Sequence, residues 1–227
     1  MAYYSNVNTT ILDLIGAEVQ SICEFGCGAG ALAEAVKIKN PTVFYVGIDI
    51  AAEPLRDAAR FLDVAIQCNV DTYPHWDDHP QMKEAIPPNH FDCIVFGDVL
   101  EHLYAPEIAV QQAVARLKPG GVLIACIPNV QHWSVFVQLV SGSWPRHDEG
   151  LFDRTHIRWF ALSDMCLLLQ NEGLSVEKVV PRVFNEPAGR EILEFLEPLA
   201  QHLHQEPEQF VSMSLPLQYV LVGRKVN

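Results

Sequence analysis

The stretch that decides the fold spans residues 21–30 and reads Ser21-Ile22-Cys23-Glu24-Phe25-Gly26-Cys27-Gly28-Ala29-Gly30. Its first five residues are mostly apolar and predict a short buried strand, and its three glycines predict a sharp turn that leads into a helix. Glycine has no Cβ, so Gly26, Gly28 and Gly30 allow a positive φ and let a ligand lie against main-chain N–H groups. The helix that follows adds its positive N-terminal end. The sequence therefore predicts a ligand site at this turn.

Two ligand classes use such a turn, the dinucleotides and S-adenosylmethionine (SAM). The spacing Gly26-x-Gly28-x-x-Ala31 also fits the dinucleotide fingerprint, so spacing alone does not separate them. Glu24 favours SAM, because a carboxylate beside the turn repels a pyrophosphate and suits an ammonium and a sulfonium. A glycine turn without any ligand stays the alternative.

These residues resemble motif I of the class I SAM-dependent methyltransferases, Glu/Asp-x-Gly-x-Gly-x-Gly. A buried strand is predicted over residues 43–48, and it stops at Asp49, nineteen residues beyond Gly30. The resemblance implies that Asp49 binds the ribose hydroxyls of the cofactor and that Ile50 lies against the adenine. A helix-capping role for Asp49 is compatible with this one.

A third strand, predicted over residues 64–68, ends at Asn69-Val70-Asp71. Members of this class often place an acid or an amide here, against the adenine amino group. We therefore predict cofactor contacts from Asn69 and Val70, with Asp71 as a second candidate for the polar contact. A plain polar loop fits the sequence about as well.

The strand predicted over residues 91–96 is followed by Asp98-Val99-Leu100-Glu101-His102, and the turn Lys118-Pro119-Gly120-Gly121 precedes a strand over 122–127. In open α/β sheets, ligands bind at the carboxyl ends of the strands. The first segment resembles motif IV of small-molecule class I methyltransferases, and the turn and strand resemble the next element of that family. The resemblance implies that Asp98 contacts the cofactor and His102 the substrate.

A metal site is a further interpretation of residues 98–102. On a helical turn Glu101 and His102 fall three and four residues after Asp98, so all three could approach one ion, with His132 and His156 available downstream. Similar Glu-x-x-Glu-His sequences bind Mg²⁺ in ubiquinone O-methyltransferases and small-RNA 2′-O-methyltransferases. We favour a role in packing and in shaping the pocket, and we predict no metal.

Two segments extend the minimal core and are predicted to cap the substrate site, residues 128–160 and 185–213. A long connection between core elements is usually functional. The residues predicted to bind substrate share an aromatic or amide side chain in or near these segments, and they are His102, Asn129, His132, Trp133, Trp159 and Tyr4. An exposed terminus is the alternative for Tyr4.

His156 is the predicted catalytic base, because histidine titrates near neutral pH and related sequences carry a histidine here that faces the methyl donor. A hydroxyl acceptor usually needs such a base, whereas an amine does not. A structural histidine bonded to a backbone carbonyl is the alternative. Arg154 is predicted to anchor the substrate, and an ion pair within its own loop is the competing interpretation.

The length, charge and cysteine content of the chain limit the classes of function that it could have. The chain has 227 residues, 49% of them hydrophobic and 19% charged, with a net charge of −13, which predicts one globular domain over 1–227 and disfavours nucleic acid as a partner. The six cysteines lack paired metal or disulfide spacing, and we interpret them as reduced core residues. No targeting or membrane-spanning segment is evident, so we predict a cytoplasmic protein without a membrane partner. A homodimer stays open.

The resemblance implies an α/β, Rossmann-like fold: a seven-stranded, mostly parallel sheet with an antiparallel last strand and helices on both faces. Cap insertions are expected after strand 5 and between strands 6 and 7. The predicted function is methyl transfer from SAM to a small-molecule acceptor, most simply a hydroxyl oxygen, with S-adenosylhomocysteine as product. Alternatives are N-methylation of a small molecule or protein group and a non-catalytic SAM-binding subunit. An oxidoreductase that binds a dinucleotide is a third and less favoured alternative.

Overall fold

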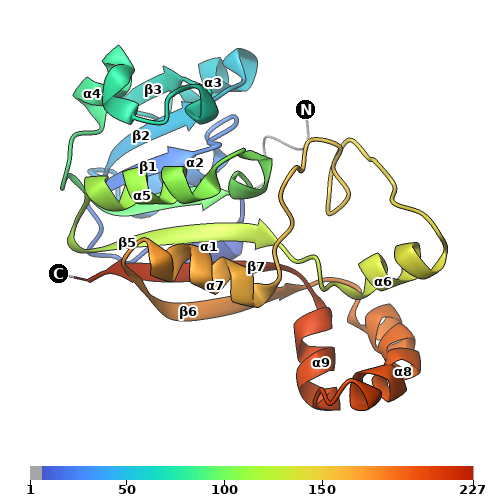
Figure 1. Ribbon diagram of the computed structural model, residues 1–227. Coiled ribbons are helices and arrows are strands. Elements are labelled where there is room, and N and C mark those ends of the chain that lie inside the picture. Colours follow the sequence, from blue (N-terminus) through green and yellow to red (C-terminus); the bar gives the residue numbers. More distant parts are fainter. Residues whose placement is uncertain (1–6, 227) are drawn as a thin grey trace.

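The computed structural model describes residues 7–226 and shows a seven-stranded sheet flanked by helices (Figure 1). The strands are β1 (Ser21–Phe25), β2 (Phe44–Asp49), β3 (Val64–Gln67), β4 (Phe91–Gly97), β5 (Leu117–Pro128), β6 (Leu174–Val183) and β7 (Pro216–Lys225). Their order in the sheet is β3-β2-β1-β4-β5-β7-β6. Strand β7 runs antiparallel to both neighbours, β5 and β6, and all other pairs are parallel. The predicted fold class is confirmed.

Helices cover both faces of the sheet. They are α1 (Thr9–Leu14), α2 (Ala31–Lys39), α3 (Ala52–Ala58), α4 (Pro80–Ala85), α5 (Pro106–Arg116), α6 (Trp133–Val140), α7 (Leu162–Asn171), α8 (Glu186–His202) and α9 (Pro207–Ser214). Helices α5 and α7 pack against one face, and α1 and α2 against the other. Helices α6, α8 and α9 lie together beyond the carboxyl edge of the sheet (Figure 1).

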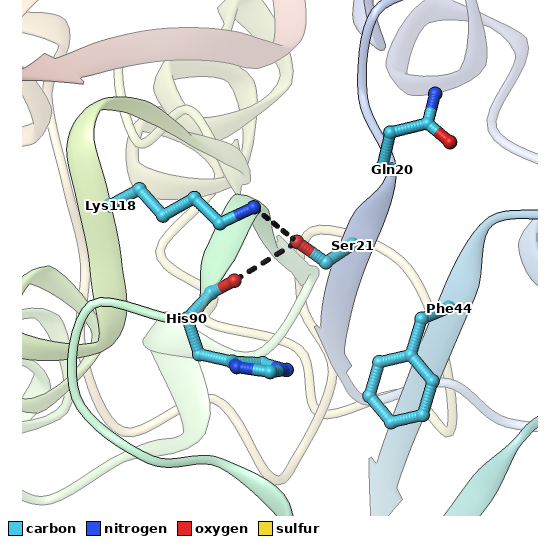
Figure 2. Close-up of a pocket in the computed structure, with 5 residues that line it drawn as sticks. All are labelled: Gln20, Ser21, Phe44, His90 and Lys118. Carbon is cyan, nitrogen blue, oxygen red and sulfur yellow. Dashed lines mark hydrogen bonds between the residues drawn. The ribbon is translucent and has the colours of Figure 1, made fainter.

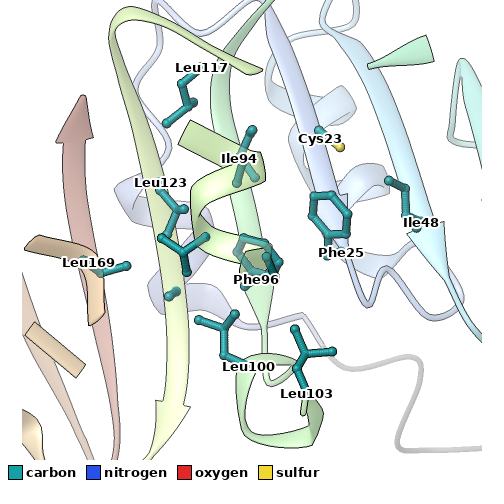
Figure 3. Close-up of a cluster of buried hydrophobic side chains, with 14 of the residues drawn as sticks. Cys23, Phe25, Ile48, Ile94, Phe96, Leu100, Leu103, Leu117, Leu123 and Leu169 are labelled. Carbon is teal, nitrogen blue, oxygen red and sulfur yellow. The ribbon is translucent and has the colours of Figure 1, made fainter. Parts of the chain in front are cut away.

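The larger core lies between the sheet and the α5–α7 layer (Figure 3). Side chains alternate between the two faces of a strand, so β1 sends Phe25 into this core and Ile22 into the core on the opposite face. The rings of Phe25 and Phe96 stack with centroids 4.8 Å apart, which joins β1 to β4. Both faces of the central strands are therefore fixed by packing.

The register of the sheet positions the site. Glu24 of β1 lies beside Gly47 of β2 and Val95 of β4. The three parallel strands therefore end at one edge, and the segments that follow them meet there. This edge brings together the glycine turn, Asp49 and Asp98.

Two of the helices are short: α1 ends at Leu14, before the turn that begins at Gly16, and α3 ends at Ala58. Helices α6 and α9 were not predicted at all. Within residues 7–226, no helix has both the length and the apolar character that crossing a membrane requires.

Candidate active site

The glycine turn is built as the sequence predicts. Gly26, Gly28 and Gly30 have φ values of 75°, 51° and 80°, in the left-handed region that favours glycine. The N–H of Gly26 donates to the carbonyl of Ile48 at 2.8 Å, which ties the turn to β2. A Cβ on Gly26 would lie 2.4 Å from Cγ2 of Val99, so only glycine fits between the turn and the segment after β4.

Asp49 links the glycine turn to the segment that leads into α3. Its carboxylate accepts from the N–H of Gly28 at 2.8 Å and from the N–H of Ala51 at 2.7 Å, one bond on each oxygen. The side chain is only 7% exposed. Neither bond caps α3, whose N-cap is Ala51 and which has no side-chain cap, and the carboxylate can still accept further hydrogen bonds from a ligand.

Glu24 lies inside β1 rather than in the turn itself. It is buried, and the hydroxyl of Tyr45 donates to its Oε2 at 2.8 Å. Burial raises the pKa of Glu24 to about 8, an effect that the Tyr45 hydrogen bond partly offsets. A cation near this carboxyl group would favour its ionised form, so the position suits a cationic ligand such as SAM.

Ile50, which is predicted to lie against the adenine, is 63% exposed to solvent. Asn69 is exposed and accepts from the N–H of Asp71 at 3.0 Å, while Val70 is half-buried. Asp71 in turn accepts from the N–H of Tyr104 at 3.1 Å, so its carboxylate fixes the loop after β4. Both polar candidates therefore accept one main-chain hydrogen bond, and their oxygens keep lone pairs that could accept from an adenine amino group.

Asp98 does not join Glu101 and His102 in one cluster. It adopts φ 55°, and its carboxylate accepts a short hydrogen bond from Gln218, which itself accepts from Arg182. Residues 100–102 form the 3₁₀ turn η4 (Leu100–His102), so the expected α-helical spacing does not apply. The grouping of these three residues on one helical turn, which the metal-site alternative required, therefore does not form. Burial raises the pKa of Asp98.

His156, and not Asp98, forms a cluster with Glu101 and His102. The side chains of Glu101, His102 and His156 offer oxygen and nitrogen atoms that all lie within 4.8 Å of one another. Nε2 of His156 is 3.8 Å from Oε1 of Glu101, and the two imidazole centroids are 4.7 Å apart. The N–H groups of Ile157 and Arg158 both donate to the carbonyl of Glu101 at 3.0 Å. These bonds hold the cap segment against the end of β4.

The hydrogen bonds fix the protons on both histidines. Nδ1 of His156 lies 3.0 Å from the carbonyl of Leu151, and Nδ1 of His102 lies 3.2 Å from the carbonyl of Thr155. A carbonyl only accepts, so we assign the proton to Nδ1 in each ring, which leaves each Nε2 with a free lone pair. The predicted base and the structural alternative for His156 are therefore compatible, since they use different nitrogens.

Burial sets the charge of this cluster. It lowers the pKa of His156, and it raises the pKa of Glu101 well above its ordinary value, with Asp98 adding to the increase. Both oxygens of Glu101 are buried without a hydrogen-bond partner among residues 7–226. At neutral pH the imidazole of His156 is uncharged and can accept a proton.

The same three residues could hold a metal ion. Each histidine bonds an oxygen through Nδ1, the usual arrangement of a metal-binding histidine, and the carboxylate of Glu101 is unpartnered. Two imidazoles and one carboxylate suit a divalent transition metal, whereas Mg²⁺ prefers oxygen ligands. The donor set therefore does not favour Mg²⁺, and we derive no step through it.

Other predicted residues have different surroundings. Arg154 is exposed and pairs with Asp148 at 2.6 Å, as the competing interpretation expected, and it does not join the histidine cluster. Asn129 is fully buried, and its amide donates to the carbonyls of Met213 and Pro216, which ties β5 to β7. Tyr4 lies outside the described residues.

Three aromatic candidates lie within the 128–160 segment. The ring of Trp159 packs 5.8 Å from that of His156, between centroids. His132 is buried at the start of α6, where its ring contacts that of Trp133 at 5.0 Å. Neither His132 nor Trp133 belongs to the group of Glu101, so His132 is not a ligand candidate for the same ion.

A surface hollow of about 420 Å³ lies at the opposite, amino edge of the sheet (Figure 2). There Ser21 donates to the carbonyl of His90 at 3.1 Å and accepts from Lys118 at 3.4 Å. Asp92 accepts from Ser21 and Lys118 and so joins the ends of β1 and β4. These polar groups satisfy one another, and the hollow is remote from the chemistry, so we interpret it as structural.

Sequence reasoning missed the partners that orient the site. Tyr45, Thr155 and Gln218 each hold an acidic or imidazole side chain in place. Tyr45 and Glu24 lie on neighbouring strands, and Gln218 is 120 residues from Asp98 along the chain. Only the register of the sheet brings such pairs together. Thr155 alone had a local signal, since it follows Asp153 by the two residues typical of an Asx turn.

The sheet order, the glycine turn after β1 and the acid at the end of β2 define the class I SAM-dependent methyltransferase fold. A SAM-dependent methyltransferase from Archaeoglobus fulgidus has the same fold, with a TM-score of 0.62 and 13% identity over 98% of this chain and 96% of that one. Residues 5–179 match the family described as "Methyltransferase domain", and the chain belongs to that family. The predicted class and SAM as its cofactor are confirmed.

Curated relatives are ubiquinone biosynthesis O-methyltransferases. The mitochondrial protein of Mus musculus is 29% identical over 181 residues, which cover 74% of this chain and 45% of the relative. The protein of Actinobacillus pleuropneumoniae serotype 5b (strain L20) is 34% identical over 107 residues, 46% of this chain and 44% of the relative. The chain thus spans less than half the length of these two relatives.

Proposed function

We propose that this protein transfers the methyl group of SAM to a hydroxyl oxygen of a small-molecule acceptor, with His156 as the general base. The observation that carries this proposal is the tautomer of His156: the Leu151 carbonyl binds Nδ1, so the Nε2 lone pair is available. The name of the relatives supports oxygen as the methylated atom. The predicted cytoplasmic location and a homodimer stay predictions.

Bound SAM supplies an activated methyl group on a sulfonium. The glycine turn offers it a main-chain surface without side chains, Asp49 its carboxylate and Glu24 a buried acid. Val99 lies against Gly26, so the turn and the histidine cluster that follows β4 are neighbours. In a single displacement the acceptor oxygen bonds to the methyl carbon as the carbon–sulfur bond breaks, and Nε2 of His156 takes the hydroxyl proton. The products are a methyl ether and S-adenosylhomocysteine.

Glu101 completes the proposed mechanism. When His156 takes up the proton, its imidazolium faces the Glu101 carboxyl group at 3.8 Å. Burial favours the neutral acid form of Glu101, so the dipole of its carboxyl group, and not a full negative charge, faces the imidazolium, and a dipole acts more strongly in a dry site than in water. We assign Glu101 the role of stabilising this cation, and the Leu151 carbonyl the role of orienting the ring.

The first test is calorimetric titration with S-adenosylhomocysteine on wild type and on Asp49→Ala. We expect wild type to bind and the variant to lose about 1–3 kcal/mol, the range for a buried polar group that loses its partner. Asp57→Ala is the matched control, because it removes an exposed acid from the same region, in α3. No binding by wild type would refute the proposal at its base.

The second test measures transfer of labelled methyl to a panel of hydroxyl and amine acceptors. Label on a hydroxyl, lost in His156→Ala and retained with a chelator, would support the proposal. Label only on amines would favour N-methylation, and cofactor binding without any turnover would favour a non-catalytic subunit. Loss of activity with a chelator would instead assign Glu101, His102 and His156 to a metal.

A further inference from the structure

Two hydrogen-bonding atoms are buried without a partner at the start of α6. They are Nε2 of His132 and Nε1 of Trp133, and neither has a hydrogen-bond partner in the described part of the chain. His132 is only 4% exposed, and the two ring centroids are 5.0 Å apart. Buried polar groups are nearly always hydrogen-bonded, so a neighbouring pair without partners points to a missing ligand.

Both atoms are donors. Indole Nε1 always carries a proton. For His132, the backbone N–H of Ser134 points at Nδ1 from 3.4 Å, and the Ser134 hydroxyl lies 2.7 Å away. Since a backbone N–H can only donate, Nδ1 accepts, and burial lowers the pKa of the ring to about 4. The ring is therefore neutral near pH 7, with its single proton on Nε2.

The two donors lie where both cap segments meet the sheet. The N–H of His132 donates to the carbonyl of Asn129 at 3.1 Å, directly after β5 ends at the carboxyl edge. Trp133 packs on α8, where a Cβ on Gly189 would lie 2.8 Å from Nε1. Glycine at position 189 thus permits the position of the indole. The donor pair therefore lies where the 128–160 segment contacts the 185–213 segment.

We propose that His132 Nε2–H and Trp133 Nε1–H bind an uncharged carbonyl oxygen of the methyl acceptor, at a point remote from its methylated hydroxyl. Two donors require an oxygen that accepts. A carboxylate is disfavoured, because both rings are neutral and their hydrogen bonds involve no Lys or Arg, so a buried anion would lack a counter-charge. This inference rests on the proposed function in one respect: it identifies the ligand as the molecule that receives the methyl group.

The test uses ¹⁵N-labelled protein and two probes of similar shape, acetophenone, which has a carbonyl, and ethylbenzene, which has none. We expect acetophenone to move the His132 Nε2–H and Trp133 Nε1–H proton resonances downfield, as a new hydrogen bond does, and ethylbenzene at equal concentration to leave them in place. Two-bond ¹H–¹⁵N spectra should show the Nε2–H tautomer of His132. Equal responses to both probes, no response to acetophenone, or the other tautomer would each overturn the proposal.

Four variants separate the hydrogen bonds from packing. Trp133→Phe deletes the indole N–H and keeps an aromatic ring, and we expect acetophenone to bind about tenfold more weakly. Trp144→Phe, in the same cap segment, is the matched control and should leave acetophenone binding unchanged. His132→Gln, which keeps a side-chain N–H donor, should lose less than His132→Leu. Equal losses in all four variants would contradict recognition through these two N–H groups.

The outcome does not depend on the cofactor tests. The titration is run with and without S-adenosylhomocysteine, and the N–H resonances are measured in both cases. Failure of S-adenosylhomocysteine to bind would count against the proposed function alone. Unchanged N–H resonances in protein that does bind it would overturn only the carbonyl assignment.

Discussion

The cofactor edge and the acceptor side of this protein satisfy their polar groups differently. At the cofactor edge both oxygens of Asp49 accept main-chain hydrogen bonds, and Glu24 accepts from Tyr45. On the acceptor side, Glu101, His132 and Trp133 keep buried polar atoms without partners among residues 7–226. The side chains of the cofactor edge are thus fixed by hydrogen bonds within the protein. The acceptor side retains donors and acceptors that are available to a ligand.

This difference has an energetic meaning. A buried polar atom without a partner costs about 1–3 kcal/mol, so a fold retains several of them only at some expense in stability. Such atoms are expected where a ligand supplies the missing bonds. The comparison therefore assigns the cofactor edge to preorganised binding and the acceptor side to recognition that is completed by the substrate.

The largest expected effect is on the acceptor side. His156→Ala should lower the rate of methyl transfer about 10²–10⁴-fold, because it removes the general base. S-adenosylhomocysteine binding, measured by calorimetry, should stay unchanged. His147→Ala serves as control, since that histidine is exposed in the same loop. Equal activity of the two variants would show that His156 is structural.

The next effect concerns Glu24 and pH. Its pKa rises from an ordinary value of 4.5 to about 8, so between these values the folded protein holds a proton that the unfolded chain releases. Stability therefore falls as pH rises from about 4.5 to about 8, by roughly 5 kcal/mol for this one group. Glu24→Gln should remove this part of the pH dependence in urea unfolding.

A matched control for this measurement is Glu34→Gln, which changes an exposed acid of α2. The control should unfold with the pH dependence of wild type. If the Glu24→Gln curve runs parallel to wild type over the same pH range, the cofactor edge does not hold a protonated acid.

A smaller effect tests the close fit of the glycine turn. Gly26→Ala should cost roughly 2–4 kcal/mol of unfolding free energy, because it combines a left-handed backbone with a clash against Val99. Gly120→Ala shares the φ of 75° but has no atom within 4 Å of the new Cβ, and should cost about 1 kcal/mol. Equal losses would mean that contact with Val99 does not restrict position 26.

The smallest effect is expected at Arg154. Its ion pair with Asp148 is exposed, so Arg154→Ala should change the free energy of unfolding by less than about 1 kcal/mol and the transfer rate by less than about twofold. Urea unfolding and a transfer assay measure both. A large loss of methyl transfer would show that Arg154 does anchor the substrate, and the acceptor side would then include this residue.

Much of the fold follows from the sequence, because buried parallel strands appear as short apolar runs between turn signals. Strands β1 to β4 were placed within about one residue at most ends. Helix α6 was missed, since it is only eight residues long and lies in a segment interpreted as a cap. Helix α9 is only eight residues long and was hidden in a segment interpreted as a cap. Its Pro207 start signal was overlooked.

The positions of the glycine turn and Asp49 follow from the sequence, because each lies at the end of one strand. His156 lies in a loop of the 128–160 segment, so its place beside Glu101 does not follow from a strand end. The position of Asp98 was not predictable either, because its left-handed backbone and its bond to Gln218 depend on β7, far along the chain. The unpaired atoms of His132 and Trp133 were equally hidden, since a sequence names a polar side chain but not its missing partner.

The two main-chain hydrogen bonds from Ile157 and Arg158 to the Glu101 carbonyl also allow opening of the 128–160 segment to be followed by amide hydrogen exchange. When the segment lifts, both amides are released together, and each release lets solvent deuterium replace the amide proton. Their protection from exchange therefore measures the free energy of opening of this contact. A change in that protection on addition of S-adenosylhomocysteine would show that the ligand shifts the equilibrium between the closed and the open segment.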